Sequence, residues 1–552
     1  MENQRLFLLI AFTAVSFFGW QTWQADKLAA SQPITAAATT ADLASNDLPA
    51  ASVASANTDG IPEHQARSQI EAATPSKHII RVTTDTLDIQ IDLNGGDVIH
   101  AALPGFTLNL ESKDPVVLLQ HGNAFTYLAQ SGLTNLDSNS ARPLFTANAS
   151  QFSMAEGSNS LVVPLTYRDQ NGLEVTKSFT FTRGKHSIKV DYEVENGSTA
   201  AVDMRLWARL RQSVVGGDEG SFFMPTFRGA AYSTADKRYE KLTFEQLGSD
   251  DRLKETTLGG WVAMLQHYFV SAWVPVAGDS NELFSNNNGS LGDVGYLGPI
   301  ATIDAGSTAT FNSTLYVGPK DQESLSALSP SLNLVVDYGI LWFISQPLHW
   351  LLTMIHSLVG NWGVAIILIT LAVKGALYKL TKTQYVSMAK MRLLQPKLAA
   401  LKERYGDDRQ KMSAAMMELY KKEKVNPLGG CLPILLQMPI FIALYWVLVE
   451  SVELRQAPFA LWIQDLSVKD PYFVLPLLMG ASMFIMQKLS PTAVTDPMQQ
   501  KMMQWMPVIF TAFFLMFPSG LVLYWLFSNL VSIGQQWMIN RAIDKQGLKA
   551  SV

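Results

Sequence analysis

A lysine inside a long apolar segment is the feature that most restricts how this chain can fold. Lys374 lies within Gly363–Tyr378, a segment that contains no acidic residue. A segment this apolar predicts a membrane-spanning helix. A cation near the centre of such a helix costs about 3 kcal/mol or more. It therefore needs a carboxylate partner, a water-filled cavity, or a position near the helix end.

Two interpretations of Lys374 remain open on the sequence alone. In one, the residue lies about one turn from the cytoplasmic interface and extends its ammonium group outward. In the other, which we favour, it lies in a wet cavity that has a function. Thr370 supports the cavity, because it lies one turn earlier on the same helix face and extends the polar stripe deeper into the membrane.

Apolar residues of the 552-residue chain are segregated to its C-terminal half, where 16 of the 21 methionines lie from Met354 onward. Together with an N-terminal helix, this half predicts an α-helical bundle of six transmembrane helices. The five spans of the C-terminal half are expected near residues 361–380, 428–449, 472–489, 502–517 and 521–539. Residues 337–358 contain too many polar positions to span, and predict an amphipathic helix in the membrane interface.

Residues 1–25 predict a signal-anchor transmembrane helix, because an apolar segment follows Arg5 and is flanked by Trp20 and Trp23. A cleaved signal peptide is the alternative. Either segment would direct residues 26–76 across the membrane. That stretch is rich in Ala, Ser, Thr and Asp, a composition that predicts a flexible linker.

Residues 77–336 carry the alternating pattern of half-buried strands and predict one large all-β sandwich. Apolar side chains alternate with charged ones from Ile188 to Glu195. Phe179–Phe181 precedes that strand across a turn at Arg183–Gly184, which predicts a hairpin. Leu87–Leu93 and Ala309–Val317 follow the same pattern.

Signatures of catalysis or cofactor binding are missing from the sequence. Gly184-Lys185 lacks the upstream glycine of a phosphate-binding loop, and the histidines are isolated. Cys431 is the only cysteine, so an intrachain disulfide is impossible. We therefore expect neither an enzyme nor a metal or cofactor.

A strongly basic segment, residues 381–425, follows the Lys374 helix and predicts a cytoplasmic helical hairpin. Between Gly375 and Val425 there are 12 Lys and Arg residues against 5 Asp and Glu residues. With the tail at 541–552 also inside, both termini are expected in the cytoplasm. The charge exceeds what orientation requires, although a solvated face accounts for most of it. We expect the surplus to contact a ribosome or targeting factor without reading a nucleic-acid sequence. The candidate residues are Lys402, Arg404, Arg409 and Lys411.

Several further polar residues lie at membrane depth in the predicted spans. They include Gln437, Ser528 and Asn529, with Gln535 and Gln536 close by. Each of them could simply join helices by hydrogen bonds. Taken together with Thr370 and Lys374, they predict a polar concavity.

Five motifs in the membrane half resemble the YidC/Oxa/Alb family of membrane-protein insertases, and the N-terminal helix with a large β region resembles its Gram-negative form. The motifs are Asn361-Trp-Gly363, Asn426-Pro-Leu-Gly-Gly-Cys431, Gln437-Met-Pro-Ile-Phe441, Thr495-Asp-Pro-Met-Gln-Gln500 and Phe517-Pro-Ser-Gly-Leu521. The resemblance implies a periplasmic β-supersandwich and a five-helix insertase core. It also implies a hydrophilic groove open to cytoplasm and lipid but closed toward the periplasm.

The implied function is to insert and help fold integral inner-membrane proteins, alone or with the Sec translocon, and in contact with membrane lipids. Lys374 departs from the family, which usually has arginine there. Tyr524-Trp525 is a second departure, because relatives often have two tyrosines facing the substrate. A cation in a wet groove would attract acidic residues of a nascent membrane protein. Partition of its apolar surface, at about 25 cal/mol per Å², would drive insertion without ATP.

Three other functions are less consistent with the residues. A secondary transporter can also place a lysine at mid-membrane, but it should show repeated halves, and we find none. An intramembrane serine protease needs Ser and His in its core, whereas Ser519 lies in a Pro-Ser-Gly turn. A mutarotase-like enzyme in the β region would rest on analogy of fold alone.

Overall fold

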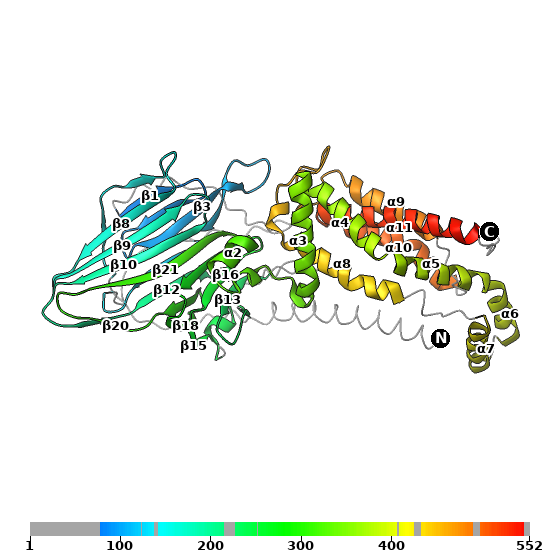
Figure 1. Ribbon diagram of the computed structural model, residues 1–552, viewed down its shortest axis with the longest axis horizontal. Helices are drawn as coiled ribbons and strands as arrows, with labels where there is room; N and C mark the ends of the chain where they lie inside the picture. Colours follow the sequence, from blue (N-terminus) through cyan, green and yellow to red (C-terminus); the bar gives the residue numbers. More distant parts are fainter. Residues whose placement is uncertain are drawn as a thin grey trace, which may run out of the picture. The chain divides into compact units, whose positions relative to one another are not determined.

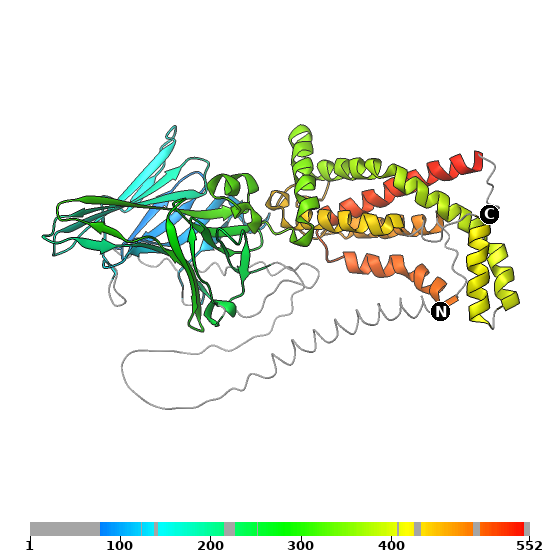
Figure 2. The ribbon, with the colours of Figure 1, turned by 60° about the horizontal axis from the view of Figure 1, so that its bottom comes forward.

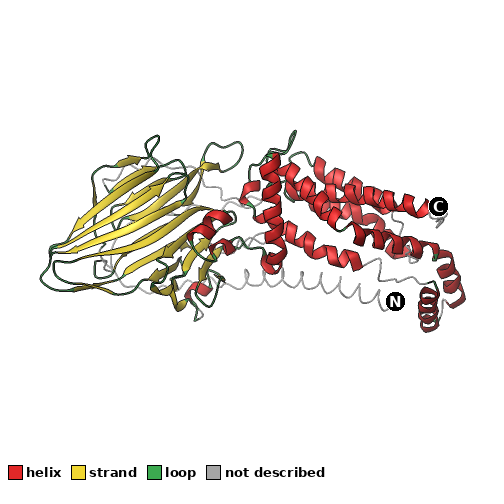
Figure 3. Cartoon of the chain, in the orientation of Figure 1, coloured by secondary structure: helices red, strands yellow, loops and turns green. Residues whose placement is uncertain are grey.

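The computed structural model describes residues 78–122, 124–136, 142–214, 227–250, 252–405, 408–423, 432–489 and 497–545. Strands occupy this part of the chain up to Pro319, and helices occupy most of the remainder (Figures 1 and 3). The predicted N-terminal span at 1–25 and linker at 26–76 lie outside the described residues.

The strands form two large sheets and one small one. The first sheet has the order β15-β18-β19-β12-β5-β3-β2-β1-β7, with β4 also paired to β3, and the second has the order β14-β13-β16-β17-β21-β10-β9-β8-β6. Strands of the first sheet are β1 (Ile79–Thr83), β2 (Asp88–Asp92), β3 (Asp97–Thr107), β4 (Pro115–Leu119), β5 (Tyr127–Leu133), β7 (Gln151–Ser153), β12 (Leu206–Ser213), β15 (Lys254–Leu258), β18 (Ser280–Asn287) and β19 (Leu291–Leu297). Those of the second are β6 (Thr146–Ala147), β8 (Ser160–Arg168), β9 (Leu173–Thr182), β10 (Ser187–Asn196), β13 (Gly229–Ser233), β14 (Glu240–Leu242), β16 (Trp261–Leu265), β17 (Phe269–Pro275) and β21 (Thr308–Pro319). The small sheet pairs β11 (Val202–Met204) with β20 (Ala301–Ile303).

The predicted hairpin is confirmed, because β9 and β10 pair antiparallel with Ile188 opposite Phe181. Along β10 the side chains of Val190, Tyr192 and Val194 are buried, whereas the charged residues between them are more exposed. Apolar residues from both large sheets form one core, which explains why the alternating pattern is so regular.

Helices follow from Gln322 onward. The α-helices are α2 (Gln322–Leu328), α3 (Trp342–Val359), α4 (Trp362–Ala376), α5 (Tyr378–Leu393), α6 (Gln395–Tyr405), α7 (Arg409–Lys422), α8 (Leu432–Glu450), α9 (Val474–Leu489), α10 (Pro497–Phe514) and α11 (Ser519–Lys545). Single 3₁₀ turns lie at η1 (Gln246–Gly248), η2 (Leu332–Val335), η3 (Gly339–Leu341) and η5 (Val452–Leu454). The helix α11 lies beside α4 and α9 (Figure 1).

The helix lengths do not confirm six spans. Among the described residues, no single helix is both long and apolar enough to cross a membrane. Trp362–Ala376 and Tyr378–Lys390 meet that criterion only as a pair, and they are bent by 64°. The segment predicted as one span at 361–380 is therefore two helices, α4 and α5, that meet at Leu377.

Helix α3 (Trp342–Val359) overlaps residues 337–358, and its place in a membrane interface stays a prediction. Trp342, Phe343 and Trp350 are exposed, whereas Leu348 and Leu352 are buried. The helix runs crosswise to α4 and α8, against which it packs (Figures 1 and 2). It thus presents an apolar face in addition to the one that it buries.

The segment after α8 is bonded to the β region. Arg455 donates to the carbonyl oxygens of Thr107 and Leu108 at 2.6 and 2.8 Å. Burial lowers the pKa of His267 to about 3, so its ring is neutral and its Nε2–H donates to the carbonyl of Val449 at 3.0 Å. Strands and helices therefore share a junction built from specific hydrogen bonds.

Candidate functional site around Lys374

The ammonium group of Lys374 lies between α4 and α11. Its Nζ donates to Ser532 Oγ at 3.0 Å, and the residue is only 8% exposed. Ser532 Oγ in turn donates to the carbonyl of Ser528 at 2.8 Å. Within the part of the chain that the structure describes, no carboxylate forms an ion pair with Lys374. Because an ammonium group carries three donors, this hydroxyl satisfies only part of its capacity.

Thr370 contributes less to the site than its position predicts. The residue is fully buried, and its Oγ1 donates to the carbonyl of Ile366 in its own helix at 2.6 Å. A hydroxyl bonded to the preceding turn is satisfied locally. The polar stripe of α4 therefore offers Lys374 as its one charged donor.

The polar residues of α11 mostly join helices. Asn529 donates from Nδ2 to Ser482 Oγ on α9 at 3.0 Å. Gln536 donates from Nε2 to the carbonyl of Leu489 at 2.9 Å. These two residues fit the interpretation as interhelical contacts. Gln535 instead donates to the backbone carbonyl of Lys374 at 3.1 Å, which fixes α11 against α4 beside the ammonium group.

Tyr524 and Trp525 lie in an aromatic cluster of α8, α10 and α11. Tyr524 stacks on Phe441 with ring centroids 5.9 Å apart. Trp525 contacts Phe441 and Phe514 edge-on, at 4.6 and 4.5 Å between centroids. Tyr524 is buried and Trp525 is partly buried, so the pair packs the bundle in this conformation. Gln437 is partly buried on α8.

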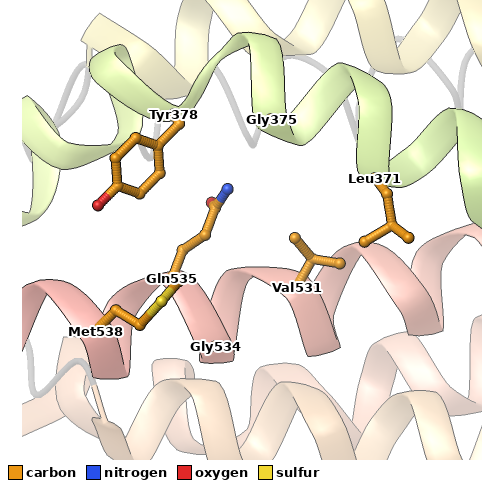
Figure 4. A pocket seen from close by; sticks show the side chains of 7 residues that line it. All are labelled: Leu371, Gly375, Tyr378, Val531, Gly534, Gln535 and Met538. Carbon is orange, nitrogen blue, oxygen red and sulfur yellow. The ribbon is translucent and has the colours of Figure 1, made fainter.

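A cavity of about 490 Å³ lies next to α4 (Figure 4), and Lys374 is not among its lining residues. It is bounded by α4 and α5 on one side and by α11 on the other. The lining residues are Leu371, Gly375, Tyr378, Val531, Gly534, Gln535 and Met538. None of the seven groove residues predicted from the sequence lines it.

Comparison with known proteins decides the family. Residues 354–546 match the family described as 60Kd inner membrane protein, and residues 79–351 match the YidC periplasmic domain. The chain is 57% identical over 556 residues to the membrane protein insertase YidC of Shewanella pealeana, with both chains covered completely. The chain belongs to the YidC family. The protein of that name from Shewanella amazonensis is also 57% identical, over 559 residues and all of both chains.

A solved structure of an active YidC insertase covers 83% of this chain and 92% of its own, with 20% identity and a TM-score of 0.37. The resemblance to the YidC family that the motifs indicated is thus confirmed by the full-length relatives. The matched families describe an inner membrane protein and a periplasmic domain, which places the two halves of the chain in those categories.

The hairpin cations predicted to bind a partner are only partly visible in this YidC-family chain. Lys411 pairs with Asp408 at 3.0 Å on an exposed surface, and Arg404 lies 5.6 Å from the ring centre of Tyr405. The side chains of Lys402 and Arg409 lie outside the described residues. Asp408 caps α7 by accepting from the backbone N–H of Lys411 at 3.1 Å.

Sequence reasoning missed Ser532, the residue that contacts Lys374 most directly. A signal was present, because Ser528 and Ser532 are four residues apart and therefore share one face of α11. It also missed the ion pair between Lys320 and Glu450, whose Nζ and Oε2 are 3.7 Å apart. Nothing local in the sequence links two residues so far apart.

Proposed function

We propose that this YidC-family chain inserts integral proteins into the bacterial inner membrane, and that Lys374 is the cation that attracts their acidic residues. The observation that carries the proposal is a buried ammonium group whose described side-chain partner is one neutral hydroxyl, Ser532. Full-length similarity to insertases named YidC supports the same function. We call the protein being inserted the client.

The electrostatic attraction between Lys374 and a client carboxylate can be estimated from Coulomb's law. Two unit charges 4 Å apart attract by about 4 kcal/mol at an effective dielectric constant of 20. The ammonium group of Lys374 can hold Ser532 and a client carboxylate together, because each uses a different donor. If Lys374 formed an ion pair with a carboxylate of its own chain, its attraction for a client carboxylate would be weaker.

Partition of the client's apolar segment into lipid would complete its insertion. The client segment that leaves the site for lipid gains about 25 cal/mol for each Å² of apolar surface removed from water. This gain needs no nucleotide. We place Thr370, Gln437, Tyr524, Trp525, Ser528 and Asn529 along the hydrophilic groove that the family resemblance implies.

Reconstitution with two matched clients tests the proposal. The purified full chain is placed in liposomes, and insertion of a short client is measured by protease protection. We expect Lys374→Ala to block a client with acidic residues in its translocated segment. The same client with those residues changed to Asn should be affected much less. Equal loss for both clients would show that Lys374 does not act through charge.

The same assay separates an insertase from a secondary transporter. An insertase should insert the client in liposomes without any ion gradient. A transporter with a mid-membrane lysine would show solute uptake and no insertion.

The basic hairpin is proposed to contact the ribosome or a targeting factor. Neutralising Lys402, Arg404, Arg409 and Lys411 together leaves Lys379, Lys382 and Lys390 to maintain orientation. Ribosome binding by the variant should weaken, with a smaller dependence on salt. Unchanged binding at moderate salt would mean that the charges only solvate the hairpin. Cooperation with the Sec translocon and a topology with both termini in the cytoplasm belong to the same proposal.

The β region is proposed to be largely dispensable for insertion. Deleting about residues 60–320, while keeping the N-terminal helix and Asp337–Leu358, should preserve most of the activity. The deletion also removes the carbonyl partners of Arg455, so membrane levels of the truncated chain must be measured alongside. Complete loss of insertion at normal levels would refute this expectation.

A further inference from the structure

We propose that the cavity between the α4–α5 bend and α11 holds an acyl chain of an anionic phospholipid, and that Lys382 and Arg541 bind the phosphate group of this lipid. The inference uses the match of this chain to an inner membrane protein, and it does not depend on the role proposed for Lys374. It assigns a lipid to a cavity that the proposed function leaves unused.

The dimensions of the cavity fit a hydrocarbon chain better than a helix. On one wall its lining residues extend from Leu371 to Tyr378, which is about 10 Å at 1.5 Å per residue. Over that length, the volume of 490 Å³ corresponds to a mean cross-section of about 50 Å², whereas a helix about 11 Å across needs roughly 95 Å². Leu371 and Met538 are exposed, so the cavity opens sideways. A lipid tail can therefore enter it from the bilayer.

The lining of the cavity carries no charged side chain. Apart from two glycines, it consists of Leu371, Val531, Met538, Tyr378 and Gln535. Gln535 is only 6% exposed and donates to a backbone carbonyl of α4, so it adds little polar surface. Such a lining favours hydrocarbon over a small hydrophilic anion, which would lose its hydration there.

Two cations follow the lining residues at one end of the cavity. The two walls end at Tyr378 and Met538, which lie at the same end (Figure 4). Both chains continue beyond that end, where α5 and α11 pack against each other. Lys382 comes four residues after Tyr378, and Arg541 comes three after Met538, so each lies on the same side of its helix as the lining residue before it.

Both cations are placed to contact an anion at the level of lipid headgroups. The side chains of Lys382 and Arg541 are exposed, and among the described residues neither forms an ion pair with a carboxylate. The guanidinium carbon of Arg541 lies 5.0 Å from the ring centre of Trp537. Tryptophan and tyrosine concentrate at the membrane–water interface, which places Trp537 and Tyr378 near the headgroups. Basic pockets between membrane helices at this level bind the phosphate groups of anionic lipids.

The apolar cavity and the two cations together select the occupant. Inorganic phosphate has no apolar part that could fill the cavity. A phosphatidylcholine has the acyl chain, but its headgroup also carries a quaternary ammonium, which Lys382 and Arg541 repel. An anionic phospholipid meets both requirements. Each cation should contribute about fivefold to its retention, which corresponds to about 1 kcal/mol per basic residue near the membrane surface.

Native mass spectrometry tests the lipid site. The purified full-length chain is extracted in mild detergent from bilayers of equal parts phosphatidylglycerol and phosphatidylcholine, and the lipids retained by each chain are identified. We expect phosphatidylglycerol to exceed phosphatidylcholine at least fivefold. Lys382→Gln combined with Arg541→Gln should lower its retention at least tenfold, while Lys379 and Lys390 remain to maintain orientation.

A matched control for the cations lies on α9. Lys488 is also exposed and lies over an aromatic ring, with its Nζ 4.7 Å from the ring centre of Phe484, but α9 does not line the cavity. Lys488→Gln should therefore lower the retention of phosphatidylglycerol less than twofold. A loss as large as that of the double variant would mean that positive charge anywhere on the helices attracts the lipid, and would overturn the site.

Filling the cavity tests the acyl-chain part separately. A Cβ added to Gly534 would have nothing within 4 Å, so Gly534→Phe extends into the cavity without displacing a neighbour. This variant should retain at least fivefold less phosphatidylglycerol although both cations are present. Leu530→Phe, at an exposed position outside the lining, should change retention less than twofold. Glycerol 3-phosphate, which has the phosphate but no acyl chain, should not displace the lipid.

The remaining outcomes also decide the inference. Equal retention of the two phospholipids by the unmodified chain would overturn it. Unchanged retention in Gly534→Phe, or displacement of the lipid by glycerol 3-phosphate, would show that the cations attract phosphate without an acyl chain in the cavity, and would overturn it as well. None of these measurements involves insertion of a client, so the function proposed above stands or falls separately.

Discussion

The β region and the helical region each bury a lysine, and they treat it in opposite ways. In the β region, Lys177 is completely buried, and its Nζ donates to the carbonyl oxygens of Gly95, Gly96 and Ser131 at 3.1, 2.8 and 3.3 Å. In the helical region, Lys374 donates to the hydroxyl of Ser532. Lys177 has all three donors engaged, whereas within the described residues the ammonium group of Lys374 donates to a single acceptor.

The surroundings of Lys177 confirm that it is structural. Its Nζ lies 5.0 Å from the ring centre of Tyr192 and 5.2 Å from that of Phe179. Gly96 adopts a φ of +63°, and a Cβ there would come within 2.9 Å of the lysine side chain. The turn is built around the cation. Lys374 is also buried, but in the described residues its ammonium group has no comparable ring of carbonyl oxygens.

A third buried lysine lies between these extremes. Lys320 faces Glu450 at the junction of the two regions, with 3.7 Å between Nζ and Oε2. Burial lowers the pKa of Lys320, and the nearby Glu450 carboxylate opposes that shift. The comparison teaches that burial alone does not mark a functional cation. The three lysines differ instead in the number and charge of their described partners.

The largest expected effect on insertion comes from substituting Lys374, and it tests the contrast between Lys374 and the structural Lys177. Insertion of an acidic client should fall by roughly 100-fold or more in Lys374→Ala and further in Lys374→Glu, because an attraction of about 4 kcal/mol is removed or reversed. Lys374→Arg should retain activity within about threefold, since the charge is kept. Insertion kinetics in liposomes provide the measurement, with Lys379→Ala as the exposed control. Full activity in Lys374→Ala would remove the basis for calling this cation functional.

The next effect is on stability in the β region. Lys177→Met should destabilise that region by about 2 kcal/mol, because the carbonyl of Gly96 loses its ammonium donor. The carbonyls of Gly95 and Ser131 still accept from Arg142. Lys374→Met should leave stability unchanged or higher, since it removes a poorly paired buried charge. Pulse proteolysis in urea measures both, with the exposed Lys189→Met as control. A similar loss at both sites would mean that the two cations do not differ in role.

An ion-pair partner introduced next to Lys374 should engage its ammonium group within the protein, as the carbonyl oxygens engage that of Lys177. Ser532→Asp places a carboxylate beside Nζ and should lower insertion of acidic clients by roughly tenfold, because the internal ion pair competes with the client. Ser532→Asn is the neutral control and should cost less than threefold. The comparison would fail if both variants behaved alike.

The smallest effect concerns the junction. Lys320→Met and Glu450→Gln should each weaken the attachment of the β region, because each leaves its partner buried and less well paired. The double variant should be less harmful than the sum, with a coupling of about 1 kcal/mol in a thermal-unfolding cycle. Additive effects would show that the 3.7 Å contact contributes nothing by itself.

The strands could be predicted from the sequence wherever buried and exposed side chains alternate along the chain. Lys177 itself lies in register with the buried positions of β9, between Val175 and Phe179, so the two-residue period already places it inside. What the pattern could not supply was its partners, because Gly95 lies in the turn between β2 and β3 and Ser131 lies in β5, both far from β9 in the sequence. The Lys320–Glu450 pair escaped prediction for the same reason.

The helices were predicted less well where the chain bends. Apolar content alone cannot distinguish one span at 361–380 from two helices that meet at Leu377, because the residues of both are equally apolar up to Leu377. In the site, Lys374 was identifiable because it is the exception in an apolar segment. Tyr524 and Trp525 were assigned to the groove by resemblance, and only packing against Phe441 places them in a cluster.

The order of the strands determines which of them lie at the sheet edges, where an unfolded chain could pair with the protein. In the part that the structure describes, three outermost strands are very short: β7 has three residues, β14 has three and β6 has two. The fourth, β15, begins with the charged pair Lys254 and Glu255. Short or charged edge strands offer few free backbone groups for strand addition. At these four edges, an extended client would therefore find few backbone groups with which to pair, which lowers the tendency of the β region to capture unfolded chains.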